Sequence, residues 1–325
     1  MTKTFQLFHA LCLSACALIA SPTTLAQSYP NKPLHIVVPF PPGAGTDMFA
    51  RAIGAKLSES FGQAVLVDNK PGGGATIGTD FVAKSAPDGY TMLLSTASHS
   101  INPAVYSKLP YDTLKDFATI TQVANVPIVL VVNPSVPVHS LKELMTLAKA
   151  KPGELNMGSS GSGTVFHLAG ELLKTMAGID MVHVPFKGGG PAITALIGGQ
   201  VQVLFETTLT VSPQVKAGRM RALAVGSLRR APSMPDVPTI NESGYPGFSA
   251  ENWYGVYVPA GTPRDIVMKL NHEIVKALHL SDVMERFASQ GAELIANTPE
   301  QHATFLMAEI KKWERIAKLA NARAD

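Results

Sequence analysis

The stretch LHIVVPFPPGAGTD, residues 34–47, lays out the first unit of the fold. Residues 34–38 are mostly apolar, which predicts a strand buried on both faces, as in a parallel sheet covered by helices. Proline and glycine interrupt the pattern over residues 39–45 and predict a loop. A helix is expected from about Asp47 to Ser60. The stretch therefore predicts the strand, loop and helix that open a βαβ unit.

The same order recurs along the chain, which indicates an α/β fold with two units. The first unit continues with strands expected over residues 64–68 and 90–95 and a helix over 77–84. The pattern restarts after Val126. From there we expect strands over 128–132, 182–184, 201–205, 220–226, 255–258 and 293–295. Helices are expected over 141–150, from Val165 to Met176, over 191–197, and from Pro263, Ser281 and Thr298. At the last of these helices, the sequence TPEQ predicts a capping box. The proline-rich residues 227–250 predict an interdomain crossing or a long surface loop.

Composition limits the classes of function. A length of 325 residues suggests two domains, and a hydrophobic fraction of 46% excludes a disordered chain. The 27 Lys and Arg residues against 24 Asp and Glu give a net charge of only +3, without a basic block, so no nucleic-acid partner is expected. Aromatic residues make up 7% of the chain, too few to predict stacking platforms for bases or sugars.

The N-terminal segment has the layout of a secretory signal. Lys3 gives a short positive region, residues 11–20 are apolar, and the small residues that follow predict cleavage after Ala26. The alternative is a lipobox over residues 13–16, which would leave a lipidated Cys16 as the N-terminus. The apolar residues that continue after Cys16 favour cleavage after Ala26. The exported chain would then hold no cysteine, so neither a thiol nucleophile nor a cysteine–zinc site is expected.

Two glycine-rich loops each connect a predicted strand to a predicted helix, at residues 39–47 and 158–164. The first N–H groups of a helix lack partners within the helix, and together with the helix dipole they attract anions. Hydroxyl groups in these loops add donors: Thr46, Ser159, Ser160, Ser162 and Thr164. Either loop alone suits a tight turn with an ordinary helix cap. One loop in each unit favours two half-sites that face each other across a cleft.

The common catalytic and cofactor patterns are incomplete. The dinucleotide pattern fails because Met48 occupies its last glycine position, and the phosphate-loop pattern fails because Thr164 stands where lysine is required. The nucleophile elbow fails because Ser162 stands where a glycine should follow Ser160. The nine histidines, one of them in the signal segment, are scattered, so neither a metal site nor a cofactor is expected.

Three single residues near the loops have two interpretations each. His167 lies one turn into the helix after the second loop and would either contact a bound anion or bond its own loop. Asp47 would either bind a ligand ammonium or a water, or favour the dipole of its own helix. Glu206 follows a predicted buried strand and would either select a donor group of a ligand or be a plain loop acid.

Ordered motifs along the chain carry a family resemblance. After the first strand and loop they are residues 68–72 (DNKPG), 88–91 (DGYT), 109–112 (LPYD), 158–164 with His167, 183–188 (HVPFKG), 223–225 (LAV), 235–239 (PDVPT), 244–247 (GYPG) and 259–263 (PAGTP). With these motifs, the sequence over about residues 30–320 resembles the Bug-type extracytoplasmic solute receptors of tripartite tricarboxylate transporters. Two departures lie near the expected site: the first loop reads PPGAG where the family often has a Gly-Gly pair, and Glu206 stands where Asp is commoner.

The resemblance implies an α/β fold of the type II periplasmic binding proteins, with two doubly wound α/β domains around a ligand cleft. After a signal peptide of residues 1–26, domain 1 would comprise residues 27–126 and 250–325, and domain 2 residues 127–249. The domains would close like a hinge on a small carboxylate: a di- or tricarboxylate, an acidic amino acid or an aromatic acid. We expect a periplasmic monomer, not an enzyme, that passes its ligand to a membrane permease of one large and one small subunit.

Carried over residue by residue, the family's carboxylate site falls on two sets of positions. In domain 1 these are Phe40, Gly43, Ala44, Gly45, Thr46 and Asp47, with Ser95 and Ser98 as further candidates. In domain 2 they are Ser160, Gly161, Ser162, Thr164 and His167, with Lys187 and Glu206 nearby. Arg51 is about a turn into its helix, so we expect recognition by backbone N–H groups and hydroxyls rather than by an arginine fork.

Two other functions stay open at this point. One is a sensor subunit that presents its ligand to a membrane kinase instead of a permease. The other is a hydrolase that uses one of the loop serines, and the incomplete nucleophile pattern argues against it.

Overall fold

The structure of the protein, a computed structural model, describes residues 29–324. The predicted signal segment lies outside the described residues, and so do both of its predicted processing sites, after Ala26 and at Cys16. From Lys32 onwards the chain forms one compact unit. In the part of the chain that is described, no helix is long and apolar enough to cross a membrane.

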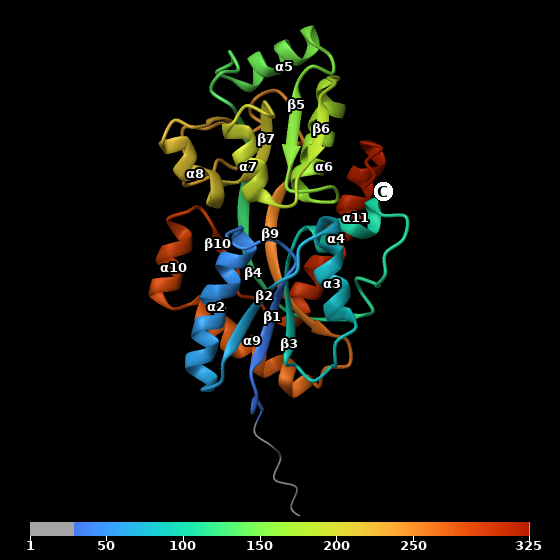
Figure 1. Cartoon of the computed structure of the whole chain (residues 1–325), viewed down its shortest axis with the longest axis vertical. Coiled ribbons are helices and arrows are strands. Elements are labelled where there is room, and N and C mark those ends of the chain that lie inside the picture. Colours follow the sequence, from blue (N-terminus) through green and yellow to red (C-terminus); the bar gives the residue numbers. More distant parts are fainter. Residues whose placement is uncertain (1–28, 325) are drawn as a thin grey trace, which may run out of the picture. The chain divides into compact units, whose positions relative to one another are not determined.

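One group of elements, which we call the first lobe, is built on three parallel strands: β1 (Leu34–Val38), β2 (Val65–Asn69) and β3 (Thr91–Thr96). The elements between and after these strands are α2 (Gly45–Phe61), the short 3-10 helix η1 (Gly73–Ala75), α3 (Thr76–Ala83) and α4 (Ser98–Val105). The C-terminal part of the chain adds α9 (Arg264–Leu278), α10 (Ser281–Ala288), β10 (Glu293–Leu294) and α11 (Pro299–Leu319). In Figure 1 these are the blue-to-cyan and the orange-to-red elements.

The second lobe is the group of green and yellow elements in Figure 1. Its strands are β5 (Asn156–Ser159), β6 (Val182–Pro185), β7 (Val203–Thr207) and β8 (Arg221–Val225), of which β5 is parallel to both β6 and β7. Its helices are α5 (Leu141–Ala150), α6 (Val165–Ala177), α7 (Gly189–Ile197) and α8 (Thr208–Lys216).

Two long strands run through the boundary between the lobes, β4 (Phe117–Val132) and β9 (Glu251–Pro259). Up to Pro127, β4 pairs antiparallel with β9, and from Ile128 it pairs with β7 and then also β8. The ten strands thus form one mixed sheet in the order β2-β1-β3-β9-β4-β7-β5-β6, with β8 and β10 paired to β4. The change of partner follows directly after Pro127, whose ring offers no N–H group to a strand ladder.

The mixed sheet differs from the parallel sheet that the apolar strands predicted. The difference comes from β9, which runs antiparallel to β3 and β4, and from β4, which runs antiparallel to β7. The first eleven residues of β4 were not predicted as a strand. Polar residues such as Gln122 and Asn125 interrupt their apolar pattern, and two irregularities in the register shift the side-chain alternation.

Two boundaries near the expected site also differ from the prediction. β7 covers residues 203–207 instead of 201–205, so Glu206 lies within the strand, near its carboxyl end, and does not follow it. α2 begins at Gly45, two residues before the expected start. Both differences arise because polar and glycine residues are typical of loops in a sequence. Here Glu206 and Thr207 still belong to β7, and Gly45 and Thr46 already belong to α2.

The capping box predicted for the last helix is confirmed. The N–H of Gln301 donates to Oγ1 of Thr298 at 3.3 Å, and the N–H of Thr298 donates to Oε1 of Gln301 at 3.0 Å. The helix buries Trp313 completely, in a hydrophobic cluster that also contains Leu93 of the first lobe and Leu130 of β4. The cluster continues to Leu168 on α6, so one core extends through both lobes.

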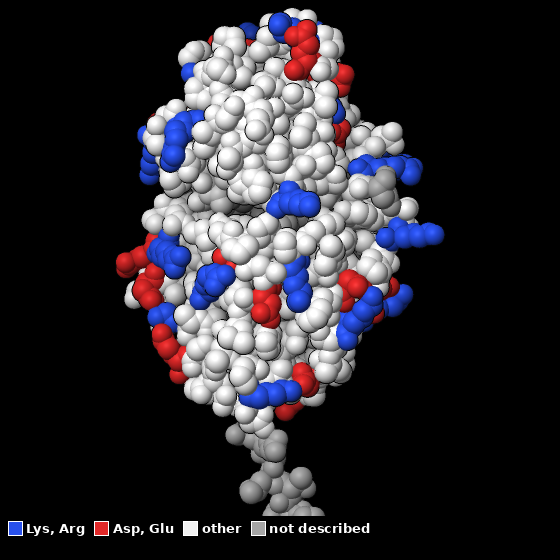
Figure 2. Space-filling model, viewed as in Figure 1, with Lys and Arg blue, Asp and Glu red and all other residues white. Residues whose placement is uncertain are grey.

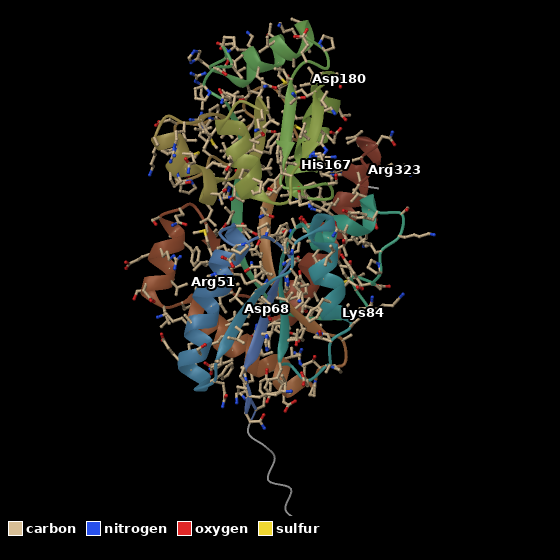
Figure 3. The ribbon with its side chains drawn as sticks, in the orientation of Figure 1. Arg51, Asp68, Lys84, His167, Asp180 and Arg323 are labelled. Carbon is tan, nitrogen blue, oxygen red and sulfur yellow. The ribbon has the colours of Figure 1, made fainter. Side chains whose placement is uncertain are left out.

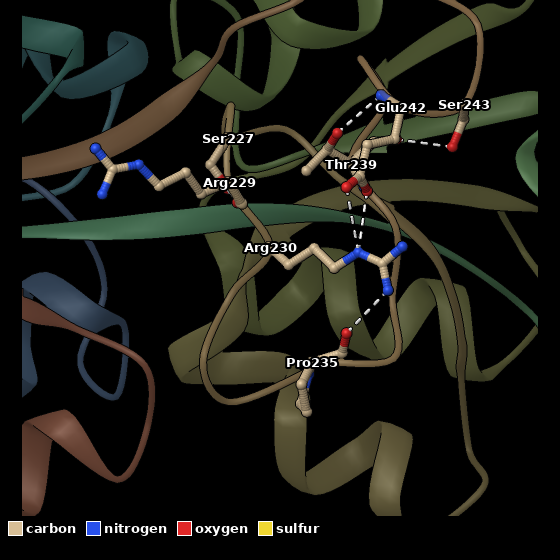
Figure 4. A network of polar contacts seen from close by, with 7 residues as sticks. All are labelled: Ser227, Arg229, Arg230, Pro235, Thr239, Glu242 and Ser243. Carbon is tan, nitrogen blue, oxygen red and sulfur yellow. Dashed lines mark hydrogen bonds and ion pairs between the residues drawn. The ribbon is translucent and has the colours of Figure 1, made fainter.

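The proline-rich segment after β8 is an ordered loop that a polar network holds together (Figure 4). The guanidinium of Arg230 donates to Oε2 of Glu242 at 3.0 Å and to the carbonyl of Pro235 at 3.2 Å. Thr239 and Glu242 exchange two further hydrogen bonds, from N–H of Thr239 to the carboxylate and from N–H of Glu242 to the hydroxyl. The segment then returns to the sheet, where the N–H of Ala250 donates to the carbonyl of Gly226 at 2.9 Å.

Candidate functional site

The loop between β1 and α2 takes its shape from a buried carboxylate, Asp47. Its Oδ2 accepts hydrogen bonds from the N–H of Gly43 and from Nε of Arg51, both at 2.9 Å, and its Oδ1 accepts one from Nδ2 of Asn69 at 3.1 Å. Burial opposes the charge, but the hydrogen bonds from Arg51, Gly43 and Asn69 together lower the pKa of Asp47 below its ordinary value. Asp47 is thus an ionised group whose hydrogen bonds stay within the first lobe.

The loop between β5 and α6 ends in a helix cap. Oγ1 of Thr164 accepts a hydrogen bond from the N–H of His167 at 3.4 Å and donates one to the carbonyl of Gly161 at 2.7 Å. Ser159 lies deeper, with its Oγ 2.6 Å from Nε2 of His183. Two of the predicted hydroxyls, those of Ser159 and Thr164, therefore serve the shape of the loop.

Two stacked imidazole rings, those of His167 and His183, contact this second loop. The rings of His167 and His183 lie 4.1 Å apart between centroids, nearly parallel. Burial lowers the pKa of His167 to about 4 and that of His183 to about 3, so both are neutral at pH 7. Nδ1 of His167 accepts a hydrogen bond from the N–H of Gly163 at 3.4 Å. Of the two interpretations of His167, this contact supports the one in which the side chain bonds its own loop. Figure 3 marks His167 beside the loop and Arg51 on α2.

A cavity of about 310 Å³ lies where the two loops meet. The beginnings of both helices line it, through Gly45 and Thr46 of α2 and through Thr164 and Val165 at α6. The predicted site residues that line the cavity are Phe40, Gly43, Ala44, Gly45, Thr46, Ser98, Ser160, Thr164 and Glu206. The structure therefore brings the two predicted half-sites together around one cavity.

The other predicted site residues lie outside this cavity. Gly161, Ser162 and Lys187 line a neighbouring cleft of about 290 Å³, together with η1 and the loop after β1. Asp47, Ser95 and His167 are buried and line neither space.

Glu206 lines the cavity from the carboxyl end of β7 and is almost completely buried, with 3% of its surface exposed. Its Oε1 accepts a hydrogen bond from the N–H of Thr207 at 2.8 Å, and its Oε2 accepts one from the hydroxyl of Ser160 at 2.9 Å. Burial raises the pKa of this carboxyl above its ordinary value, although these hydrogen bonds act in the opposite direction. A Cβ atom at Gly189 would lie 2.6 Å from Oε2, so any other residue at the start of α7 would force the carboxyl to shift.

Several residues that line the cavity were not predicted. Three of them, Gly189, Gly190 and Ile193, belong to α7, whose start FKGGGP is a third glycine-rich connection between a strand and a helix and could have been recognised as one. Four more are neighbours of predicted residues in the sequence: Met48, Thr96, Val165 and Phe166. The others have no local signal in the sequence, because they come from elements that reach the cavity only through the fold: Leu209, Thr210, Pro213, Asn252, Tyr254 and Gln290.

The cavity lining combines apolar side chains, donors at the starts of two helices and the carboxyl of Glu206. Of the residues that the structure describes, those lining the cavity include no Lys, Arg or His. Figure 2 shows a hollow between the lobes on the face in view, and mostly uncharged side chains surround it. No group of three His, Cys, Asp or Glu residues in the described part of the chain is placed to hold a metal ion.

Comparisons with known proteins identify the family of the chain and its solved relatives. Residues 49–322 match the profile of a family described as the tripartite tricarboxylate transporter family receptor. The chain is 40% identical to protein BugT of Bordetella pertussis over 311 residues, 95% of each chain. A Rhodopseudomonas palustris protein solved with adipate is 37% identical with a TM-score of 0.88, over 91% of this chain and 99% of that one. MatC of Rhodopseudomonas palustris, solved with bound malate, is 34% identical with a TM-score of 0.86, over 89% and 99%.

Proposed function

Because the chain belongs to the tripartite tricarboxylate transporter receptor family, we propose that it is a periplasmic receptor that binds a small carboxylate and delivers it to a membrane permease of one large and one small subunit. Its α/β fold is that of the periplasmic binding proteins. The family and its solved neighbours are solute-binding receptors, not enzymes.

The observation that carries the proposal is the cavity between the starts of α2 and α6. The first N–H groups of a helix carry partial positive charge and lack partners within the helix, so two such starts around one small cavity suit a carboxylate without any basic side chain. The solved relatives with adipate and malate support a carboxylic acid as the ligand class. We propose Gly45, Thr46, Ser160 and Thr164 as the residues around the carboxylate.

Binding is proposed to close the two lobes like a hinge, with domain 1 as residues 27–126 and 250–325 and domain 2 as residues 127–249. The support is the change of strand partners after Pro127 and the return at Ala250, which leave two crossings between the lobes. The hydroxyl of Tyr106 in the first lobe lies 3.4 Å from the carbonyl of Ser162 in the second, which is a contact expected at the rim of a closed cleft.

Mass spectrometry of small molecules released from the purified protein, followed by calorimetric titration, tests the proposal. A bound compound with a carboxylate supports it, and a protein that binds neither this compound nor any small carboxylic acid contradicts it. Uptake of the ligand in a deletion strain then separates delivery to a permease from presentation to a membrane kinase. N-terminal sequencing of the exported protein is expected to begin at Gln27, whereas a lipidated Cys16 in the membrane fraction would contradict the proposed processing.

A further inference from the structure

Glu206 is the only carboxyl group that lines the cavity within the described residues, and no basic side chain there offsets it. A ligand with two carboxylates would bring two negative charges into this buried space, and the carboxyl of Glu206, when ionised, would add a third. Such like charges repel strongly away from water. The charge pattern of the cavity therefore fits a ligand that brings one negative and one positive group.

The hydrogen bonds of Glu206 fit an ionised carboxylate, which a cation of the ligand would stabilise. The N–H of Thr207 can only donate, and it does so to Oε1 at 2.8 Å, while the hydroxyl of Ser160 is placed to donate to Oε2 at 2.9 Å. Oε2 also lies at the first residue of α7, where Gly189 gives it room and the helix start favours a negative charge. Each carboxyl oxygen can accept a further hydrogen bond. Among the described residues, no Lys, Arg or His that lines the cavity is there to donate it.

Two more acceptors line the same space. Oδ1 of Asn252 and Oε1 of Gln290 are buried and have no hydrogen-bond partner among the described residues. Buried acceptors of this kind are costly unless a ligand or water donates to them. The cavity lining thus offers donors at the starts of α2 and α6 together with acceptors at Glu206, Asn252 and Gln290.

We propose that Glu206 binds a protonated amine of the ligand, and that the receptor therefore selects a monocarboxylic amino acid with an apolar side chain. The inference rests on the proposed function, because it takes the carboxylate of the ligand to lie at the starts of α2 and α6. The apolar part of the ligand then packs against the wall formed by Phe166, Ile193 and Leu209. A dicarboxylate such as the adipate of the solved relative is the alternative that the experiment has to separate.

Matched ligand pairs isolate the amine. The probes are leucine with 4-methylpentanoate, phenylalanine with 3-phenylpropanoate, and adipate, each titrated calorimetrically into the ligand-free protein. We expect the amino acid of a pair to bind roughly ten- to a hundredfold more tightly than the acid that lacks only the amine, the range of one charge-assisted hydrogen bond. Glu206→Gln should abolish this difference, because the amide keeps the shape of the side chain without its charge.

Two controls keep the test decisive. Glu154→Gln makes the same change at an exposed acid of the same lobe that pairs with Lys151, and it should leave all affinities unchanged. Melting curves of each variant check the fold. If adipate or the amine-free acids bind as well as or better than the amino acids, and Glu206→Gln does not weaken amino-acid binding, the inference is wrong while the proposed carboxylate receptor stands. If none of these acids binds, the inference is contradicted, and the proposed receptor is contradicted only if the protein also binds neither the compound released from it nor any other small carboxylic acid.

Discussion

Asp47 and Arg51 illustrate how little of a side chain's role follows from its position in the sequence. Asp47 lies in a motif that suggests contact with a ligand, yet its partners are Gly43, Arg51 and Asn69, and it lines neither of the two cavities at the loops. Its role is to fix the N-terminal loop of α2, and through that loop the direction of the helix start. Arg51 supports the same carboxylate from outside, with 55% of its side chain exposed.

This geometry predicts different effects for the two partners. Asp47→Ala removes the acceptor of the Gly43 N–H and of Asn69 Nδ2, and should cost about 1–3 kcal/mol in the free energy of unfolding and weaken ligand binding through the loop. Arg51→Ala removes an exposed partner and should cost about 0–1 kcal/mol. Urea unfolding and calorimetric titration of both variants measure the difference. Equal losses of affinity in the two variants would instead indicate that the guanidinium itself takes part in binding.

The raised pKa of Glu206 predicts a pH dependence of stability. Because burial makes the folded state bind this proton more tightly than the unfolded state, the ligand-free protein should lose stability as pH rises from the ordinary glutamate pKa of about 4.5 through the raised value. Glu206→Gln removes the titrating group and should lack this component. Urea unfolding of both proteins between pH 4 and pH 8 compares them. A constant difference between the two across this range would show that Glu206 does not titrate differently in the folded state.

At the level of single residues, the sequence predicted the two loops well and the remaining site poorly. Loop residues such as Thr46 and Ser160 are recognisable because glycine and hydroxyl side chains before a helix have a direct physical meaning. Tyr254 reaches the cavity from β9 and Gln290 from just after α10, both more than two hundred residues after Thr46. Their role depends on the path of the whole sheet, which local patterns do not contain.

Among the elements, α11 begins as its sequence predicts. The reciprocal hydrogen bonds of Thr298 and Gln301 satisfy two N–H groups that the helix leaves without partners. Thr298→Ala should therefore cost about 1 kcal/mol in the free energy of unfolding. Thr304→Ala is the matched control, since Thr304 lies on the exposed side of the same helix, where alanine favours the helix. Chemical unfolding of both variants is the measurement, and an equal loss in both would contradict a specific effect of the cap.

The elements that the sequence did not predict share one property. The first part of β4, the start of β9 and the end of β7 carry polar residues at buried positions: Thr121, Asn252 and Glu206. Such residues break the alternation on which strand prediction depends. Here they are buried because their strands β4, β9 and β7 lie in the middle of the sheet order. Of these strands, β4 and β9 join the lobes and β7 carries Glu206. The same central position that hides them from prediction places them beside the proposed hinge and the cavity.

For the molecule as a whole, the contacts between the lobes distinguish an open from a closed arrangement. Pro41 of the first lobe and Gly188 of the second lie close enough that a Cβ atom at position 188 would be 3.8 Å from Cβ of Pro41. Disulfide bonds join Cβ atoms about 3.5–4.5 Å apart. The chain from Gln27 onwards contains no other cysteine, so a pair introduced at these two positions has only itself to react with.

The variant Pro41→Cys, Gly188→Cys should therefore lock the lobes together when oxidised. We expect ligand exchange to slow by orders of magnitude on oxidation and to recover on reduction, because the cavity would be reachable only when the lobes separate. The small-angle scattering profile of the oxidised, ligand-free variant should match that of the ligand-saturated natural protein. Gly188→Cys alone is the control, since any residue other than glycine is strained at its backbone φ of 112°. Unchanged exchange rates in the oxidised double variant would mean that ligands reach the cavity without any movement of the lobes, and the hinge would have to be given up.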